Sequence, residues 1–251
     1  MDLSSFQLNL IMYGISLLVA FSPLGEWILS NINKARKPKT KEEIDYLLPL
    51  FDEVYSNALT LSPSLSRNMK LKIIDDISIN AFAFGKHTIA VTSGSLETLS
   101  EGELRGVISH EFGHIANGDT KALLLSTVGN GVFSVVFIVF RLIFKILIFT
   151  LALTNTGAYL IPKIMLYILN GIEYIWNYIG QVILSINSRS NEFKADEFAF
   201  KSGYGSDLLE ALYLIKKINM NKAVPFKEKI RATHPHITDR IGNLEYLIYN
   251  N

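Results

Sequence analysis

The chain has 251 residues, of which 49% are apolar, and a formal net charge of +1. This length suits one or two domains, and the nearly balanced charge gives no reason to expect a nucleic-acid partner. Cysteine is absent, which excludes disulfides and thiolate metal sites, so any metal must be bound by His, Asp or Glu.

The first 30 residues are strongly apolar. Residues 3–29 contain no Lys or Arg, and Glu26 is their only charged residue. The apolar part is long enough to cross a bilayer, which takes about 20 residues, so residues 1–30 are predicted to form a transmembrane anchor. No basic segment precedes it, so a cleaved signal peptide is not expected. The basic stretch NKARKPKTK that follows predicts a cytoplasmic location for the next part of the chain. The alternative is a buried core helix.

The next part, residues 31–121, has a mixed composition typical of a globular domain. TKEE, from Thr40 to Glu43, is a capping box that predicts a helix from about 41 to 59, which Pro49 should kink or divide. Residues 70–94 are rich in β-branched and aromatic residues with turn signals between them, so two or three short strands are predicted.

The segment HEFGH, residues 110–114, has the spacing HExxH. A capping box at Ser100–Glu103 and a terminating Gly118 predict a helix of about 17 residues around it. His110 and His114 then share one face of that helix and can bind one metal ion. Charged residues flank the helix, so it is not predicted to span a membrane. The alternative is a pair of structural histidines.

Residues 122–186 form a second apolar block, interrupted by TNTG at 154–157 and by Pro162. Its length fits two membrane spans, so a transmembrane helical hairpin is predicted. Arg141 and Lys145 lie inside its first half and must reach an interface or a polar cavity. The alternative is two long core helices of a soluble bundle.

The last part, residues 187–251, is again globular in composition. Its segment 188–203, SRSNEFKADEFAFKSG, is charged and helical in pattern, and it ends at Gly203. Glu192 and Asp196 share one face of that helix. Glu192 would complete a zinc site with the two histidines, and Asp196 would accept the free N–H of one imidazole. The alternative is a solvated helix with ordinary carboxylates.

Four motifs, NAFAFG, VTSGSLETLSEGELRGVISHEFGHIANGD, SRSNEFKAD and THPHITDRI, occur in this order. Over about residues 40–245 the chain resembles the HtpX family of membrane-bound zinc metallopeptidases, relatives of the CAAX prenyl proteases. The resemblance implies a gluzincin-like, mainly α fold with a small β-sheet and transmembrane helices. It also implies one Zn²⁺ per chain, bound by His110, His114 and Glu192, with Glu111 as the general base.

The resemblance implies further site residues. His234 and Arg240, in THPHITDR, are candidates to stabilise the oxyanion of the reaction. An edge strand beside the cleft would bind the substrate backbone through Asn80, Ala81, Phe82 and Ala83. Arg189 matches a family position to which no role is assigned.

The expected function is therefore that of a multi-pass zinc endopeptidase of the cell membrane. Its active site would face the cytoplasm, and its substrates would be proteins or peptides, chiefly membrane proteins in quality control. Two alternatives stay open: an inactive membrane scaffold or chaperone, and a prenyl-peptide protease. The family commonly has two N-terminal spans, whereas this chain has room for one.

Overall fold

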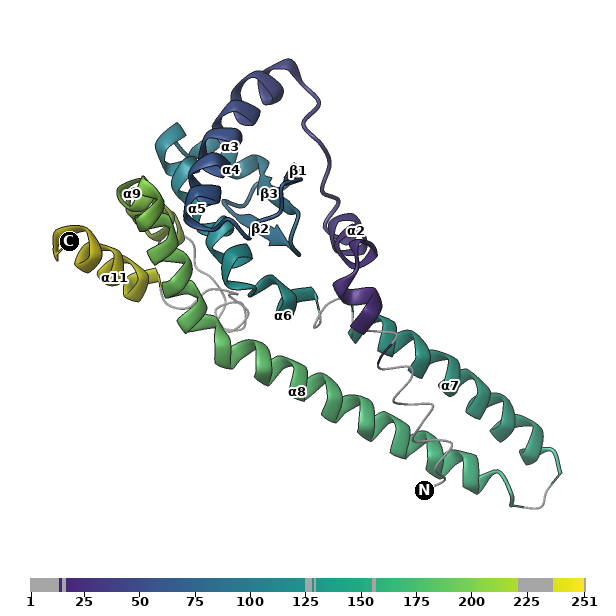
Figure 1. Ribbon diagram of the computed structural model, residues 1–251. Coiled ribbons are helices and arrows are strands. Elements are labelled where there is room, and N and C mark those ends of the chain that lie inside the picture. The colour runs from purple at the N-terminus through teal and green to yellow at the C-terminus, as the bar shows by residue number, and fades with distance from the viewer. Residues whose placement is uncertain are drawn as a thin grey trace. The chain divides into compact units, whose positions relative to one another are not determined.

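The structure is a computed structural model that describes residues 14, 17–124, 128, 130–154, 157–220 and 237–250. The described chain forms two compact units. One consists of residues up to Gly25 together with Leu124–Ile186, and the other of Glu26–Leu123 together with Asn187–Asn251. Most of the chain is helical, and a single small sheet lies among the described residues (Figure 1). This agrees with the predicted mainly α fold.

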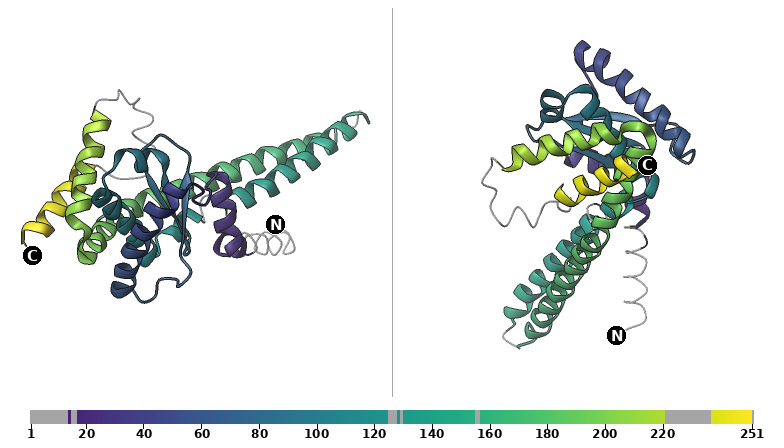
Figure 2. Two further views of the ribbon diagram at one scale, coloured as in Figure 1. Left: turned by 90° about the horizontal axis from the view of Figure 1, so that it is seen from above. Right: turned by 90° about the vertical axis from the view of Figure 1, so that its left-hand side faces the viewer.

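The first unit is built around helix α7 (Asn130–Ala152) and the first part of the 40-residue helix α8 (Leu160–Ala199). The two lie side by side in Figures 1 and 2. Between them Arg141 forms an ion pair with Glu173, and its Nε donates a hydrogen bond to Asn170 Oδ1 at 2.9 Å. The charge of Arg141, which hydropathy alone could not place, is therefore neutralised within the hairpin.

Many large apolar side chains of this hairpin are exposed, among them Val135, Ile138, Leu142, Ile146, Phe149, Ile161, Ile164, Ile168, Ile172 and Ile175. None of the helices in the described part of the chain combines the length and apolar composition needed to cross a membrane. The described residues thus do not support the transmembrane spans predicted over 1–30 and 122–186. Of the first span, residues 1–13, 15 and 16 lie outside the described part.

The second unit begins with helices α2 (Pro23–Ile32, which enters it at Glu26) and α3 (Lys41–Leu61). The capping box predicted for α3 is confirmed, because Thr40 Oγ1 accepts from the Glu43 N–H and the Glu43 side chain accepts from the Thr40 N–H. The helix continues through Pro49 without being divided. Leu47, Phe51 and Val54 face the core from it.

Three short strands follow, as predicted: β1 (Lys70–Ile74), β2 (Ala81–Phe84) and β3 (Thr88–Thr92). Their order in the sheet is β1-β3-β2, with β1 parallel and β2 antiparallel to β3. This order places β3 in the centre of the sheet and β2 at one edge. All five residues of β3 are buried, as expected for a central strand.

Helix α4 (Ser93–Thr98) leads from the sheet into α5 (Glu101–Asn117). The predicted limits of α5 are confirmed by a capping box at Ser100 and by Gly118, whose φ of 78° is left-handed. One face of α5 carries Leu104, Ile108 and Phe112 into the core. The ring of Phe112 stacks at 5.6 Å from that of Tyr55 on α3.

Helix α6 (Thr120–Leu124) follows α5, and the chain returns to this unit in the last part of α8. Helix α8 ends in a π-helical turn, η2 (Phe200–Tyr204), where Gly203 has a φ of 92°. Helices α9 (Gly205–Met220) and α11 (Ile237–Asn250) then lie side by side (Figure 2) and share a small core around Leu208, Leu212, Ile241 and Leu244.

Candidate metal centre

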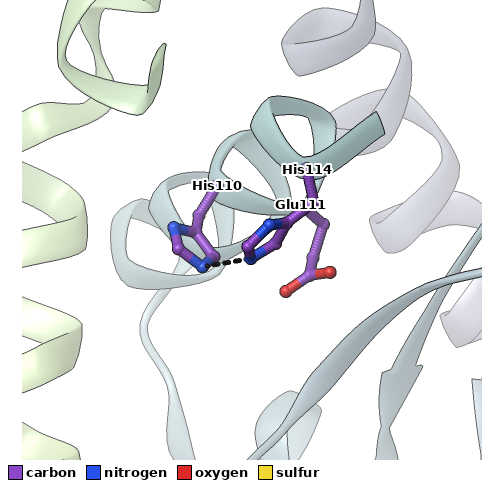
Figure 3. A group of neighbouring side chains, drawn as sticks. All are labelled: His110, Glu111 and His114. Carbon is purple, nitrogen blue, oxygen red and sulfur yellow. Dashed lines mark hydrogen bonds between the residues drawn. The ribbon is translucent and has the colours of Figure 1, made fainter. Parts of the chain in front are cut away.

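Helix α5 brings the two histidines of HEFGH together. Four residues correspond to little more than one helical turn, so both rings leave the same side of the helix (Figure 3). The Nε2 atoms of His110 and His114 lie 3.1 Å apart. Two imidazoles in this position direct one nitrogen each toward a common point.

Helix α8 supplies Glu192 to the same point. Glu192 Oε2 lies 3.4 Å from His110 Nε2, and Glu192 Oε1 lies 3.4 Å from His114 Nε2. In a tetrahedral zinc site with bonds of about 2.0–2.1 Å, neighbouring ligand atoms lie about 3.3–3.4 Å apart. The spacing of these three groups therefore fits a zinc ion bound by two histidines and one glutamate.

The second nitrogen of each histidine faces a carboxylate. Asp196 Oδ1 lies 2.9 Å from His110 Nδ1, and Asp119 Oδ2 lies 3.2 Å from His114 Nδ1. An Nδ1–H that donates to a carboxylate leaves Nε2 with its lone pair free for a metal. The arrangement thus favours the histidine tautomer that a metal site needs.

Arg240 on α11 contacts the carboxylates of Glu192 and Asp196. Its side chain is buried, and its Nη2 and Nε contact the two oxygens of Asp196 at 2.6 and 2.9 Å. Its Nη1 lies 3.0 Å from Glu192 Oε2. One guanidinium therefore holds the carboxylates of both Glu192 and Asp196.

The electrostatics of the site favour a cation. Burial raises the pKa of Asp196, but the hydrogen bond to His110 and the charge of Arg240 outweigh it and lower that pKa below its ordinary value. Burial alone lowers the pKa of His114, but hydrogen bonds to Asp119 and Glu192 raise it to about 10. The carboxylates of Asp119 and Glu192 therefore stabilise positive charge at His114.

Glu111 lies beside the histidines and is buried. One carboxylate oxygen of Glu111 and one ring nitrogen of each histidine lie within 4.8 Å of one another. Figure 3 shows the Glu111 carboxylate next to the His114 ring rather than between the two rings. Glu111 thus lies beside the point where the two Nε2 atoms converge, while Glu192 fits as the third protein ligand.

The approach of α8 to α5 depends on Gly113. A Cβ atom at this position would lie 2.8 Å from Ala195 Cα and 3.0 Å from Ala195 O. A second contact joins α5 to η2, the turn that follows α8, where the hydroxyls of Ser109 and Ser202 lie 2.5 Å apart. The absence of a side chain at Gly113 lets Glu192, one turn before Ala195, reach the histidines.

The other predicted site residues fall in two places. Asn80 precedes the edge strand β2, and its side-chain Oδ1 accepts from the N–H of Ala81 at 2.9 Å. Ala81, Phe82 and Ala83 lie within β2. His234 lies outside the described residues.

Asp119 is a site residue that the sequence did not single out. Its position five residues after His114 would lie on a different side of a continuous helix. The signal that could have revealed it is the preceding Gly118, a predicted helix terminator, because such a turn redirects the next side chain. Arg189 lies 3.8 Å from Asp239 in an exposed ion pair.

The fold and site are those of a metallopeptidase: the chain belongs to peptidase family M48, whose profile matches residues 52–248. Its relatives in this family are HtpX proteases, which confirms the predicted resemblance. A homologue from Listeria welshimeri is 30% identical over 248 residues, covering 87% of this chain and 79% of that protein. The HtpX protease of Ectopseudomonas mendocina is 28% identical over 233 residues, covering 84% of this chain and 75% of that protein.

Other alignments are shorter or more distant. A homologue from Bacteroides fragilis is 46% identical over 69 residues, which are 26% of this chain and only 21% of that protein. Among solved structures, Ste24p of S. mikatae has a TM-score of 0.50 and 20% sequence identity. That comparison covers 94% of this chain and 56% of that chain, and it shows a shared fold.

Proposed function

We propose that the protein is a zinc-dependent endopeptidase. The observation that carries this proposal is the convergence of His110 Nε2, His114 Nε2 and Glu192 at 3.1–3.4 Å from one another. Two of these groups come from α5 and the third from α8, 78 residues or more away in the sequence. Membership of family M48 supports the peptidase reading.

A zinc ion held by His110, His114 and Glu192 would supply a water activated for attack on the peptide carbonyl at neutral pH. The remaining steps belong to the side chains. Glu111 takes the proton of the attacking water and passes it to the amine of the leaving peptide. Asp196 holds His110 in the required tautomer, and Arg240 holds Asp196 and Glu192 in place.

A hydrogen-bond donor for the developing oxyanion is also needed. His234 stays the proposed donor, on the resemblance to the HtpX family. Arg240, the second candidate, already contacts two carboxylates. Such contacts favour a role for Arg240 in holding the site together, and a role at the oxyanion stays a proposal.

The substrate would bind as an added strand along β2. Among the described strands β2 pairs with β3 alone, so its other edge can accept an extended peptide. Asn80, Ala81, Phe82 and Ala83 would make the backbone contacts. Main-chain pairing of this kind binds many sequences, which suits an endopeptidase that acts on several proteins.

We propose further that residues 1–30 and 122–186 attach the protein to the cell membrane, with the metal site facing the cytoplasm and membrane proteins as substrates in quality control. The apolar composition of both segments and the exposed apolar side chains of α7 and α8 support this. Single cysteines at Lys37 and Lys222 should react from one face of the membrane, and one at Asn155 from the opposite face. Labelling of Lys37 and Lys222 from opposite faces would contradict the hairpin.

The decisive experiment replaces the general base. Glu111→Gln should keep zinc and fold but lose about 10²–10⁴-fold in peptide cleavage. Glu97→Gln, an exposed carboxylate on α4, is the matched control and should cleave normally. Near-normal turnover by zinc-loaded Glu111→Gln would refute the mechanism.

The two alternative functions give different results. An inactive scaffold or chaperone would leave zinc-loaded wild-type protein without any cleavage of a diverse peptide library. A prenyl-peptide protease would cleave prenylated peptides and leave their unmodified counterparts intact. Chelator-sensitive cleavage of unmodified peptides supports the proposed endopeptidase.

A further inference from the structure

The two histidines of the metal centre are supported by different carboxylates, and Asp119 has no part in the function proposed above. We infer that Asp119 is a positioning residue that holds the His114 ring in the orientation and tautomer required to bind the metal. This inference rests on the proposed function, because it takes His114 as a metal ligand.

The local fold delivers Asp119 to His114. In a continuous helix a residue five positions on would lie about 140° around the axis, on another side of the helix. Gly118 interrupts the helix with a φ of 78° and a ψ of 16°. The Asp119 N–H then donates to the His114 carbonyl at 3.1 Å, and the side chain turns back toward the ring. Asp119 Oδ2 consequently lies 3.2 Å from His114 Nδ1.

The contact determines what His114 offers to the metal. When Nδ1–H donates to Asp119, the proton of the neutral ring is on Nδ1, and Nε2 presents a lone pair. That Nε2 lies 3.1 Å from His110 Nε2 and 3.4 Å from Glu192 Oε1, at the point where the ligands converge. Loss of the Asp119 acceptor would free the ring to rotate and to change tautomer.

The two supporting carboxylates are held differently. Asp196 is completely buried, and Arg240 contacts both of its oxygens. Asp119 is 17% exposed at its side chain and follows directly after the end of α5. Removal of the Asp119 carboxylate therefore leaves Arg240 with both of its carboxylate partners, and its effect should be confined to the His114 ring.

The test measures zinc affinity by competition with a chromophoric chelator. Asp119→Ala should weaken zinc binding about 10–100-fold. Asp119→Asn should weaken it less, because the amide oxygen can still accept the Nδ1–H hydrogen bond. The matched control is Asp52→Ala, an exposed carboxylate on α3, which should bind zinc like the wild type. The circular-dichroism spectrum of the metal-free protein should be the same in all four, which shows that each variant folds.

A spectroscopic measurement separates positioning from a general structural role. In the zinc-loaded wild type labelled with ¹⁵N-histidine, the His114 Nδ1–H should be protected from exchange with water. This protection should be lost in Asp119→Ala and kept in Asp119→Asn.

Two results would overturn the inference. One is zinc affinity in Asp119→Ala within twofold of the wild type. The other is a loss of affinity accompanied by a changed circular-dichroism spectrum of the metal-free protein in both Asp119 variants, which would make Asp119 a structural residue only. If the wild-type protein binds no zinc, the proposed function is wrong together with this inference. If the wild type binds zinc and Asp119→Ala binds it equally tightly, only this inference is wrong.

Discussion

Replacement of Gly113 by Ala tests whether the distance between α5 and α8 controls the metal site. The added Cβ would lie 2.8 Å from Ala195 Cα and 3.0 Å from Phe198 Cβ. Ordinary contacts between carbon atoms are about 3.5–4.0 Å, so α8 must move away by about 0.7 Å. Glu192 lies one turn from Ala195 on the same helix and moves with it.

This displacement is large for a metal site, because zinc–ligand distances tolerate only about 0.2 Å. Zinc affinity should therefore fall at least tenfold, which corresponds to about 1.4 kcal/mol. The effect on folding is smaller. Overpacking costs about 1–3 kcal/mol, and the higher helix propensity of Ala offsets about 0.8–1.0 kcal/mol of that cost.

Gly242→Ala is the matched control. Gly242 also lies inside a helix, α11, but a Cβ atom there would meet nothing within 4 Å. The control should keep the zinc affinity of the wild type and melt at a higher temperature. Chelator competition and thermal melts of both variants measure the two quantities. Zinc binding by Gly113→Ala as tight as in the wild type, with a raised melting temperature, would refute the argument.

Three further predictions concern Arg240, the pH dependence of stability and the proposed oxyanion donor. Arg240→Met leaves two carboxylates buried without their cation, so it should lower the free energy of unfolding of chelator-treated protein by about 3–5 kcal/mol. Arg240→Lys should recover part of that loss, and equal stability of wild type and Arg240→Met in urea would contradict the prediction. Hydrogen bonds, chiefly from Arg36, lower the pKa of Glu43 from 4.5 to about 2. Wild type should therefore be more stable than Glu43→Gln by up to about 1 kcal/mol above pH 4.5, and the difference in thermal melts should disappear as the pH falls through about 2. His234→Ala should lower kcat about 10²–10³-fold at unchanged zinc content, and a joint loss of zinc and thermal stability would show a structural histidine instead.

Local signals in the sequence were sufficient for the elements that carry the site. The capping boxes at Thr40 and Ser100 predicted where α3 and α5 begin, and Gly118 predicted where α5 ends. These signals are hydrogen bonds between residues three or four apart, so they do not depend on the rest of the fold. The spacing of HEFGH likewise determines that both histidines lie on one side of α5.

The sequence also nominated Glu192 and Asp196, but it left a solvated helix as the alternative. Only the packed structure shows Glu192 3.4 Å from both histidines and Asp196 completely buried beside His110. The difference arises because a helical pattern defines which residues share a face, whereas the neighbour of that face is decided by helix packing.

Three features depended on the tertiary structure entirely. The contact of Asp119 with His114 requires a turn that directs the Asp119 side chain back toward the helix. The contacts of Arg240 with Asp196 and Glu192 join residues that are 44 or more positions apart in the sequence. The close approach at Gly113 is a property of two helices, because a glycine in one helix does not reveal which backbone fills the space beside it. Sequence by itself predicted the proposed ligands and determined the local geometry of the two histidines. The tertiary structure decided their orientation and charge, because these depend on groups that are distant in the chain and adjacent only after packing.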